Sequence, residues 1–274
     1  MTTRRSFLKG QLALCSSLLL ASSFDGLAKA TKIVNIKDNK GILNLMCCAD
    51  VGHLKHYVHS IKNFELSSIN LFAGSIAVSP QLGELLYGLE AANYHAINFS
   101  WQKGQTSIND LVKVIGNASL SFVNCNYAFE SKRLQELILP YIIIHHGSTK
   151  IGITGIGAQT DEKGISCKNP IVSLNKVAQH LKEQEHCDKV ICLADLGFDK
   201  QAAINNLKLA QATSNVQLVV GAGENPKGAT AWSLRNSAKD EVLVSANQNT
   251  HRYTNLLQFN FNQNQSLTFN TKNI

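Results

Sequence analysis

Proline and charged residues are scarce in this sequence, and no segment is dominated by one residue type. The 274 residues include 4 Pro and 18 Gly, and 16% are charged, whereas 44% are hydrophobic. Disordered and fibrous proteins have a different balance, with repeats, many prolines or a large excess of charge. The sequence also has no internal repeat and no linker that would divide it. This composition indicates one globular domain with enough apolar residues for a large core.

A concentrated basic surface is also lacking. The formal net charge is +7, but four basic residues and one acid lie in the first 30 residues, and without them the charge is +4. The remaining basic residues are scattered, and they form no stripe interleaved with aromatic side chains. Nucleic-acid-binding domains usually have such a concentrated patch. The charge distribution therefore gives no indication of a nucleic-acid partner.

The sequence contains no CxxC pair, so a structural zinc site is not expected. Six cysteines follow residue 30, and three of them, Cys47, Cys48 and Cys192, lie in predicted core strands, where free cysteine behaves as a small hydrophobe. An even number of cysteines in an exported protein permits disulfides. We expect at most one, with Cys167 and Cys187 as the candidate pair.

The first 30 residues have the features of an export signal, and they lack an apolar run long enough to span a bilayer. Residues 3–9 read TRRSFLK, which matches the twin-arginine consensus, and an apolar run at 12–21 precedes the cleavage-site pattern AKA at 28–30. A membrane-spanning helix needs roughly 20 apolar residues. We expect a signal peptide at 1–30, cleaved after Ala30, and a periplasmic mature domain at 31–274 without a membrane span. Lipidation at Cys15, in the lipobox-like LALC, is an open alternative.

The stretch NLMCCA at residues 44–49 organises the sequence, because this apolar run ends abruptly on Asp50. Short apolar runs bounded by turn residues are typical of buried strands, and in α/β proteins functional groups follow the carboxyl ends of such strands. Asp50 is therefore a candidate metal ligand, or else a turn or helix N-cap residue. His53, His56 and His59 follow at intervals of three residues, on one flank of a predicted helix. They would either complete a metal site with Asp50 or form a solvated helix face.

Strand and helix patterns alternate along the chain after a polar lead at residues 31–40. Strands are expected at 41–49, 68–74, 96–99, 121–125, 140–145, 150–156, 189–194 and 216–221, with three β segments at 242–269. Helices are expected at 80–92, 108–116, 170–185 and 199–213. His145 and His146 are expected at the surface, beside the turn of a hairpin formed by 140–145 and 150–156. The alternation predicts two sheets packed between helices.

Five short segments at predicted strand ends carry a resemblance to a known family. They are residues 50–53 (DVGH), 74–80 (GSIAVSP), 100–104 (SWQKG), 193–197 (LADLG) and 221–225 (GAGEN). Together with the order of elements over about residues 41–270, they resemble the N-terminal metallophosphatase domain of the 5′-nucleotidase family, part of the calcineurin-like phosphoesterases. The resemblance implies an α/β fold, a four-layer α/β/β/α metallophosphoesterase-like sandwich. It also implies an ancestral site in which two divalent metal ions activate water for attack on a phosphate ester.

Each of the five segments departs from the family pattern at a metal ligand. One residue is missing from D-x-H-G-H, which leaves Asp50 and His53. Ser75 occupies the position of the acid that bridges both metals, and a serine hydroxyl has no charge with which to hold two cations. The N-H-E of the third motif is deleted before Trp101.

The last two segments have lost histidines. The histidine of S-H-L-G maps to Ala194 or Asp195, and GAGEN, which includes Glu224, replaces G-G-H-S-H. A kept scaffold with lost ligands is typical of a pseudoenzyme, so we expect no catalytic residue and no metal cofactor. Asp50, His53, Asp195 and Glu224 are the residual metal-ligand candidates.

These departures predict an exported, non-catalytic binding or subunit protein. The alternative is a divergent metal-dependent phosphoesterase or nucleotidase in which Asp50, Asp195 and Glu224 form a carboxylate cluster for Mg²⁺ or Ca²⁺. Because family members usually carry a C-terminal nucleotidase domain that is not expected here, one possible partner is a separately encoded protein with such a domain. The ligand would be a small phosphorylated molecule or a nucleoside. Trp101 and Trp232 would either stack on a base or pack in the core or rim.

Overall fold

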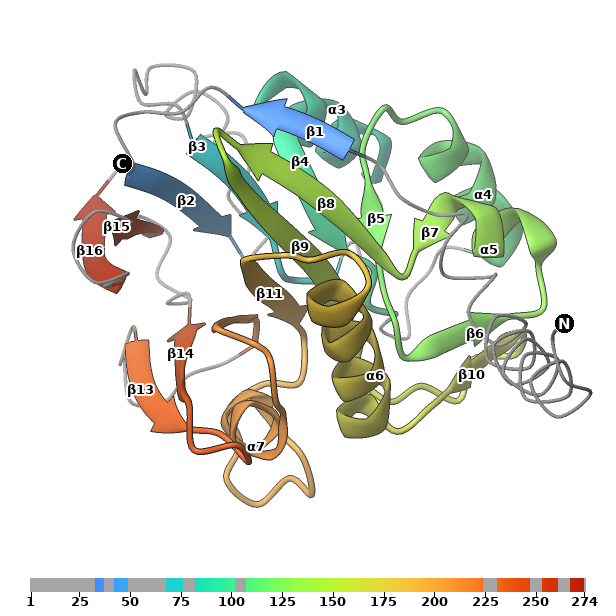
Figure 1. Ribbon diagram of the computed structural model, residues 1–274. Coiled ribbons are helices and arrows are strands. Elements are labelled where there is room, and N and C mark those ends of the chain that lie inside the picture. Colours follow the sequence, from blue (N-terminus) through green and yellow to red (C-terminus); the bar gives the residue numbers. More distant parts are fainter. Residues whose placement is uncertain are drawn as a thin grey trace, which may run out of the picture. The chain divides into compact units, whose positions relative to one another are not determined.

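The computed structural model describes residues 33–36, 42–48, 68–75, 82–101, 107–223, 231–246, 253–260 and 267–273 (Figure 1). The chain divides into two compact units, Met1–Thr31 and Lys32–Ile274. All the described residues belong to the second unit. Among them, no helix is both long enough and apolar enough to cross a membrane.

One seven-stranded sheet, sheet A, is built mainly from the second half of the chain. Its order is β1 (Ile33–Ile36), β8 (Tyr141–His146), β9 (Thr149–Ile156), β11 (Lys189–Ala194), β12 (Leu218–Gly221), β14 (Glu241–Ala246) and β13 (Ala231–Arg235). Strands β9, β11, β12 and β14 run parallel, whereas β8 and β13 are antiparallel to their neighbours β9 and β14. The carboxyl ends of four strands therefore lie along one edge.

The other seven-stranded sheet, sheet B, joins the first half of the chain to its last strands. Its order is β16 (Leu267–Asn273), β15 (Tyr253–Asn260), β2 (Ile42–Cys48), β3 (Ser68–Phe72), β4 (Tyr94–Asn98), β5 (Phe122–Val123) and β7 (Ile138–Leu139). Strands β2 to β5 are parallel. A separate antiparallel ribbon consists of β6 (Tyr127–Phe129) and β10 (Ile165–Cys167).

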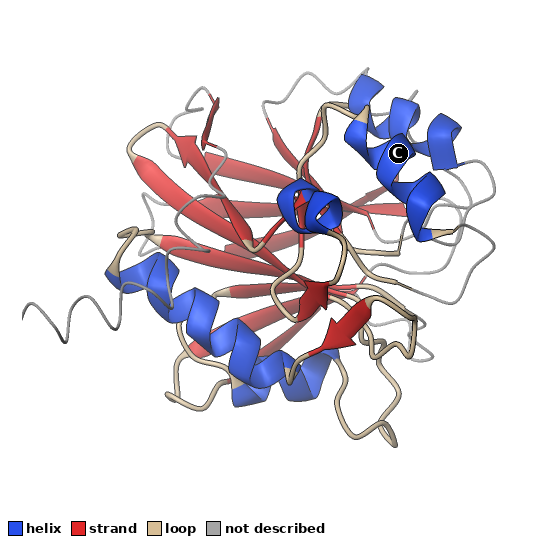
Figure 2. Ribbon diagram, turned by 90° about the vertical axis from the view of Figure 1, so that its right-hand side faces the viewer, coloured by secondary structure: helices blue, strands red, loops and turns tan. Residues whose placement is uncertain are grey.

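Helices cover the outer face of each sheet (Figure 2). The helices α6 (Pro170–Glu183) and α7 (Asn206–Ala212) pack on sheet A, and α3 (Leu82–Ala91), α4 (Ile108–Gly116) and α5 (Lys132–Leu137) lie on the side of sheet B. Side-chain oxygens fix where several helices begin: Ser107 accepts a hydrogen bond from the Asp110 amide, and Asn169 accepts from the amides of Ile171 and Val172. The buried stripe of α6, which includes Leu174 and Leu181, faces the sheet.

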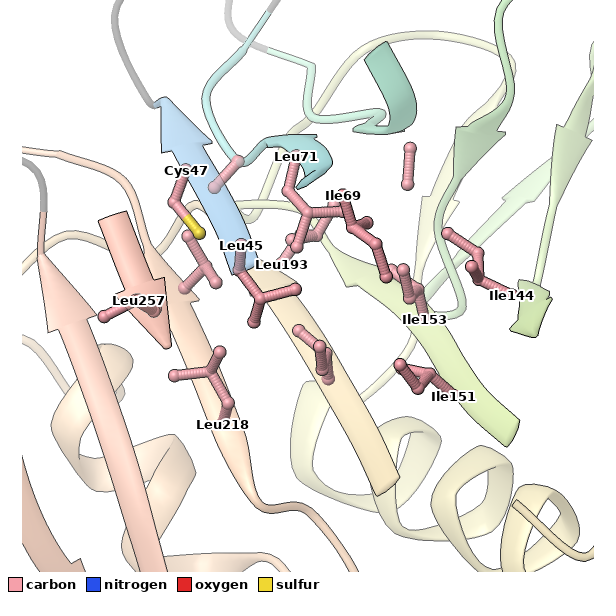
Figure 3. Close-up of a cluster of buried hydrophobic side chains, with 14 of the residues drawn as sticks. Leu45, Cys47, Ile69, Leu71, Ile144, Ile151, Ile153, Leu193, Leu218 and Leu257 are labelled. Carbon is pink, nitrogen blue, oxygen red and sulfur yellow. The ribbon is translucent and has the colours of Figure 1, made fainter. Parts of the chain in front are cut away.

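Apolar side chains from both sheets fill the space between them (Figure 3). This cluster includes Leu45, Ile69 and Leu71 from sheet B and Ile153 and Leu193 from sheet A, all 0% exposed. Strands that are covered on both faces need apolar residues at successive positions, and residues 151–156 of β9 are accordingly all buried. A second cluster lies between sheet B and helices α3, α4 and α5. The predicted layers, helix on sheet on sheet on helix, are confirmed.

Two elements have the predicted bounds, and several do not. Strand β11 and helix α4 match the predicted ranges. The prediction of a polar segment without a strand was wrong for residues 33–36, because IVNI forms β1 beside β8. The surface position predicted for His146 was also wrong, because it ends β8 and is 2% exposed. The turn of this hairpin is shorter than predicted and contains Gly147 with a φ of 58°.

Helix α7 is shorter than the predicted range 199–213. It begins after Asn205, whose backbone is extended and whose side chain accepts a hydrogen bond from the Lys208 amide at 2.8 Å. Residues 199–204 instead form turns, and the Lys208 ammonium donates to the carbonyl oxygens of Lys200 and Ala202. The strong N-cap at Asn205 therefore sets the start of α7, whereas the sequence pattern had predicted a start at residue 199.

Candidate functional site

Polar groups from both sheets meet where the parallel strands end. Ser75 follows β3, Asn98 ends β4, Ser100 lies two residues later, and Asp195 follows β11. All four are buried. A hydrogen bond links Ser75 to Ser100, and Asn98 and Asp195 both bond to the Ile156 oxygen, so this is the place where a site in this fold can form.

The Ser75 hydroxyl is engaged with the protein. Its Oγ donates a hydrogen bond to the main-chain oxygen of Ser100 at 2.7 Å, and the side chain is 8% exposed. The bond ties the segment after β3 to the segment after β4. A neutral hydroxyl that donates to a carbonyl offers little to a cation.

Asn98 joins three strand ends. Its Nδ2 donates to the carbonyl oxygens of Ala73 and Ile156, both at 3.0 Å. Ala73 follows β3 of sheet B, whereas Ile156 ends β9 of sheet A. Both amide hydrogens are thereby used, and the bonds fix the orientation of the amide group.

Asp195 lies beside Asn98, because both residues bond to the same carbonyl group. The Asp195 amide donates to the Ile156 oxygen at 3.0 Å, and the residue is 6% exposed. Its charge also acts on the nearby phenol of Tyr127, whose pKa is raised mainly by burial. Asp195 is therefore the candidate ligand that the structure places at the strand ends.

The loops after β11 and β12 touch through glycine. The Gly197 amide donates to the Ala222 oxygen at 3.2 Å, and a Cβ on Gly223 would lie 2.7 Å from the Gly197 Cα. Gly197 and Gly223 have φ values of +67° and +102°, which only glycine adopts readily. The segments that follow β11 and β12 are thus held side by side at the edge of sheet A.

Most of the predicted ligand positions lie outside the described residues. This is true of Asp50, His53, His56, His59 and Glu224. Their convergence with Asp195 stays a prediction. Among the described ranges, no group of three His, Cys, Asp or Glu side chains could hold a metal ion. The residues described at the strand ends, with neutral Ser75 and amide Asn98, do not fit a pair of divalent ions.

Both tryptophans are packed against other side chains. Trp101 is 2% exposed, and its indole Nε1 donates to Glu162 Oε2 at 3.2 Å. Trp232 stacks on Phe198 with ring centroids 5.2 Å apart and an interplanar angle of 28°. The interpretation of these residues as core and rim packing is thus favoured over base stacking.

The candidate disulfide between Cys167 and Cys187 is not formed, and both residues are free thiols in the structure. The Cys167 thiol exchanges hydrogen bonds with the main chain of Thr160. Burial raises the pKa of the Cys187 thiol to about 11 and that of Cys192 further above its usual value. Such thiols are protonated at neutral pH and unreactive.

Sequence reasoning missed the asparagines of the strand ends. Asn98, Asn124 and Asn126 are at most 4% exposed, and each side chain bonds to main-chain groups of another segment. The only signal was that these uncharged amides lie at or just after the ends of the strands expected at 96–99 and 121–125. Buried amides are hydrogen-bonded in most cases, which implies fixed partners but does not identify them, and Asn98 Oδ1 is an exception.

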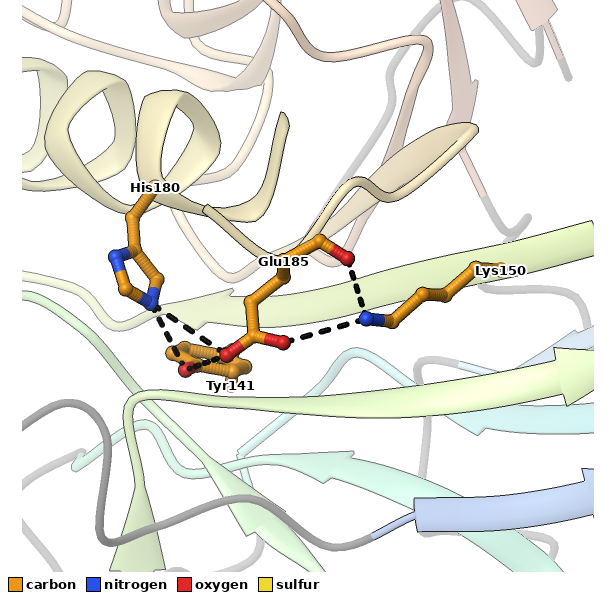
Figure 4. Close-up of polar contacts among 4 residues, drawn as sticks. All are labelled: Tyr141, Lys150, His180 and Glu185. Carbon is orange, nitrogen blue, oxygen red and sulfur yellow. Dashed lines mark hydrogen bonds and ion pairs between the residues drawn. The ribbon is translucent and has the colours of Figure 1, made fainter. Parts of the chain in front are cut away.

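A second polar cluster lies away from the strand ends, between α6 and sheet A (Figure 4). The Tyr141 hydroxyl donates to Glu185 Oε1 at 3.2 Å and lies 3.1 Å from His180 Nε2. The Lys150 ammonium bonds to Glu185 Oε2 at 3.3 Å. Because the phenolic proton goes to Glu185, His180 Nε2 must donate to the phenolic oxygen. The neutral imidazole suits this arrangement, and burial lowers the pKa of His180 although Glu185 acts in the opposite direction.

We expect this histidine to make the protein less stable in acid. With a lowered pKa in the folded state, His180 stays neutral while the unfolded chain gains a proton below about pH 6.5. The contribution is fully present above that pH and is lost as the pH falls toward the folded-state pKa. Urea denaturation at about pH 7.5 and 5.5 should show a smaller pH-dependent loss for His180→Gln than for the wild type. His186→Asn, at an exposed position, should retain the wild-type dependence.

The comparisons with known proteins find similar structures but no similar sequences. No family model matches the chain, and no curated protein matches it. The structure is similar to the NAD nucleotidase NadN of Haemophilus influenzae, with a TM-score of 0.68 and 14% identity over 84% of this chain and 49% of that one. It is also similar to a 5′-nucleotidase precursor from Thermus thermophilus, with a TM-score of 0.68 and 18% identity over 84% of this chain and 54% of that one.

A third similar structure is matched over almost its whole length. The calcineurin-like phosphoesterase YfkN of Bacillus subtilis has a TM-score of 0.64 and 14% identity, over 86% of this chain and 91% of that one. The chain thus spans about half the length of the first two proteins and nearly all of the third. The TM-scores show a shared fold, and at identities this low they show the fold alone.

Proposed function

We propose, from the metallophosphoesterase fold that these likenesses establish, that this chain is a pseudoenzyme of the 5′-nucleotidase type. It has lost the di-metal site and acts as an exported, non-catalytic binding or subunit protein. The fold places a site at the strand ends, and the proposed loss is that of metal binding and catalysis at this site.

The observation that carries the proposal is the hydrogen bond from Ser75 Oγ to the Ser100 oxygen, at 2.7 Å. In the family, the Ser75 position holds the acid that bridges both metals. Two adjacent divalent cations need negative charge between them, and a hydroxyl committed to a carbonyl supplies none. The deletion of N-H-E before Trp101 removes further nitrogen and oxygen ligands from the same region.

Location and partners follow from the sequence features. The twin-arginine pattern supports export to the periplasm with cleavage after Ala30. A separately encoded protein with a nucleotidase C-terminal domain is the proposed partner. A small phosphorylated compound or a nucleoside is the corresponding ligand class.

The competing function is a phosphoesterase with rewired carboxylate ligands. The position of Asp195 favours it, because this acid is buried at the strand ends beside Asn98. A single described carboxylate does not make a metal site, and the alternative depends on Asp50 and Glu224.

Metal analysis and a hydrolysis assay separate the two functions. After incubation with Mn²⁺, Zn²⁺, Mg²⁺ or Ca²⁺ and gel filtration, we expect the purified protein to retain no stoichiometric metal. We also expect no hydrolysis of p-nitrophenyl phosphate or 5′-AMP above the blank. Stoichiometric metal together with turnover, both lost in Asp195→Asn and kept in the exposed control Asp240→Asn, would establish the carboxylate alternative.

A further inference from the structure

The two sheets are joined by a line of hydrogen bonds at the edge where the candidate site lies. The segments after β4 and β5 of sheet B contribute residues 98–101 and 124–127, and the end of β9 in sheet A contributes residues 155–158. We call these three segments the seam. Six hydrogen bonds cross it, and every one of them ends on a main-chain group of residues 155–158.

Asn126 is the best-defined link in the seam. Its Oδ1 accepts a hydrogen bond from the Gly157 amide at 2.8 Å, and its Nδ2 donates to the Gly157 oxygen at 3.0 Å. One side chain, 2% exposed, thus satisfies both main-chain groups of the residue that directly follows β9 of the other sheet. The neighbouring Cys125 amide donates to the Gly155 oxygen at 2.8 Å.

Tyr127 and Ser100 close the next position. The Tyr127 hydroxyl donates to the Ala158 oxygen and accepts from the Trp101 amide at 3.3 Å. The Ser100 Oγ accepts from the Ala158 amide at 3.2 Å, while the Ser100 oxygen accepts from Ser75. Ser75 therefore belongs to the same network, and the place of a bridging ligand is taken by bonds within the protein.

The backbones also approach too closely at the seam for a side chain to fit. A Cβ on Gly155 would overlap the Val123 main-chain oxygen and lie 2.5 Å from Asn98 Oδ1. A Cβ on Gly157 would overlap the Tyr127 hydroxyl. Glycine at both positions permits direct contact between the two sheets.

We propose that the seam, rather than a bound metal pair, holds the carboxyl ends of the two sheets together, so that this chain folds and stays rigid at its site without divalent cations. The inference rests on the proposed loss of the metal site and goes beyond it. A site from which ligands had merely been lost would leave unsatisfied polar groups and loose loops. In the seam, instead, the main-chain groups of Gly157 and Ala158 are all paired, and Asn98 Oδ1 is the one buried side-chain atom of these three described segments that lacks a hydrogen-bond partner.

Amide hydrogen exchange with and without metal tests the inference. In EDTA, we expect the amides of Cys125, Gly157 and Ala158 to be protected as well as those of β11, and we expect no change in Tm when Mn²⁺, Mg²⁺ or Zn²⁺ is added. A ligand that binds the folded state raises Tm, so a metal-dependent seam would respond to added metal. Faster exchange at these amides in EDTA than in Mn²⁺ would overturn the inference.

A pair of asparagine variants tests the seam independently of metal. Asn126→Ala should lower Tm by about 2–4 °C or more and speed exchange at Gly157 and Ala158. Asn175→Ala is the matched control, because Asn175 bonds to Ala212 and Ser214 beside α7 and not to the seam. It should lower Tm without changing exchange at Gly157. Unchanged exchange at Gly157 in Asn126→Ala would contradict the seam. Bound metal with turnover, combined with exchange at the seam that is the same in EDTA and in Mn²⁺, would contradict only the proposed function.

Discussion

Replacement of Gly155 by alanine is expected to lower the free energy of unfolding by about 3 kcal/mol, because an added Cβ cannot be accommodated between the sheets. The new Cβ would overlap the carbonyl oxygen of Val123. This oxygen is held in place because it accepts a hydrogen bond from the Phe99 amide at 2.9 Å. Both obstacles, the Val123 main chain and the Asn98 amide, are fixed by their own hydrogen bonds. The sheets must therefore separate locally, which strains the seam over several residues. Urea denaturation followed by circular dichroism measures the change.

Gly83→Ala is the matched control for this variant. Gly83 lies inside α3, and a Cβ there meets no atom within 4 Å. Alanine in the interior of an exposed helix is favoured over glycine by about 1 kcal/mol, so this variant should be more stable than the wild type. A Gly155→Ala protein within about 0.5 kcal/mol of the wild type would show that the sheets are not in direct contact at this point.

Replacement of Ser75 by aspartate is expected to cost about 3 kcal/mol at pH 8 and to restore no activity. The new carboxylate would be buried opposite the Ser100 carbonyl oxygen, which it would repel, instead of donating to it as the hydroxyl does now. The loss should shrink toward about pH 4, because a protonated carboxyl group can again donate to that oxygen. Thermal or urea denaturation at the two pH values checks both statements.

Ser75→Ala separates the loss of the hydrogen bond from the effect of the charge. It should cost about 1 kcal/mol at either pH, since it removes one hydrogen bond and adds no ionisable group. If Mn²⁺ raised the Tm of the aspartate variant by several degrees and not that of the alanine variant, the other metal ligands would still be in place. The loss of metal binding would then be due to the serine at position 75 alone.

Much of the fold could be predicted from local patterns. Strand β11 is a continuous apolar run bounded by charged residues, and α6 has an N-cap, a proline at its first turn and an apolar stripe. Such signals depend on neighbours in the sequence and need no knowledge of tertiary contacts. The short elements were missed for the converse reason. Four residues of β1 and three each of β6 and β10 are too few for a periodicity, and each is a strand only because its partner lies beside it.

The candidate site was predictable only in part. The neutral residue at position 75 could be read directly from the sequence, and the structure places Asp195 at the predicted strand end. The partners of Asn98 and Asn126 could not be predicted, because they are main-chain groups about 30 to 60 residues away in the sequence. A residue that forms a hydrogen bond through its main chain can be of almost any type, so the sequence does not reveal such a partner. Glycine is the exception, because the close approach of the two sheets leaves no room for a side chain at Gly155 or Gly157.

The state of the cysteines has a consequence for how the protein is made. Since none of Cys47, Cys125, Cys167, Cys187 and Cys192 forms a disulfide, these five residues need no oxidant and no disulfide isomerase to reach their final state. Folding without disulfides is compatible with a reducing compartment such as the cytoplasm, which agrees with the proposed export by the twin-arginine route. Refolding from urea in the presence of a reductant should accordingly proceed as well as in its absence.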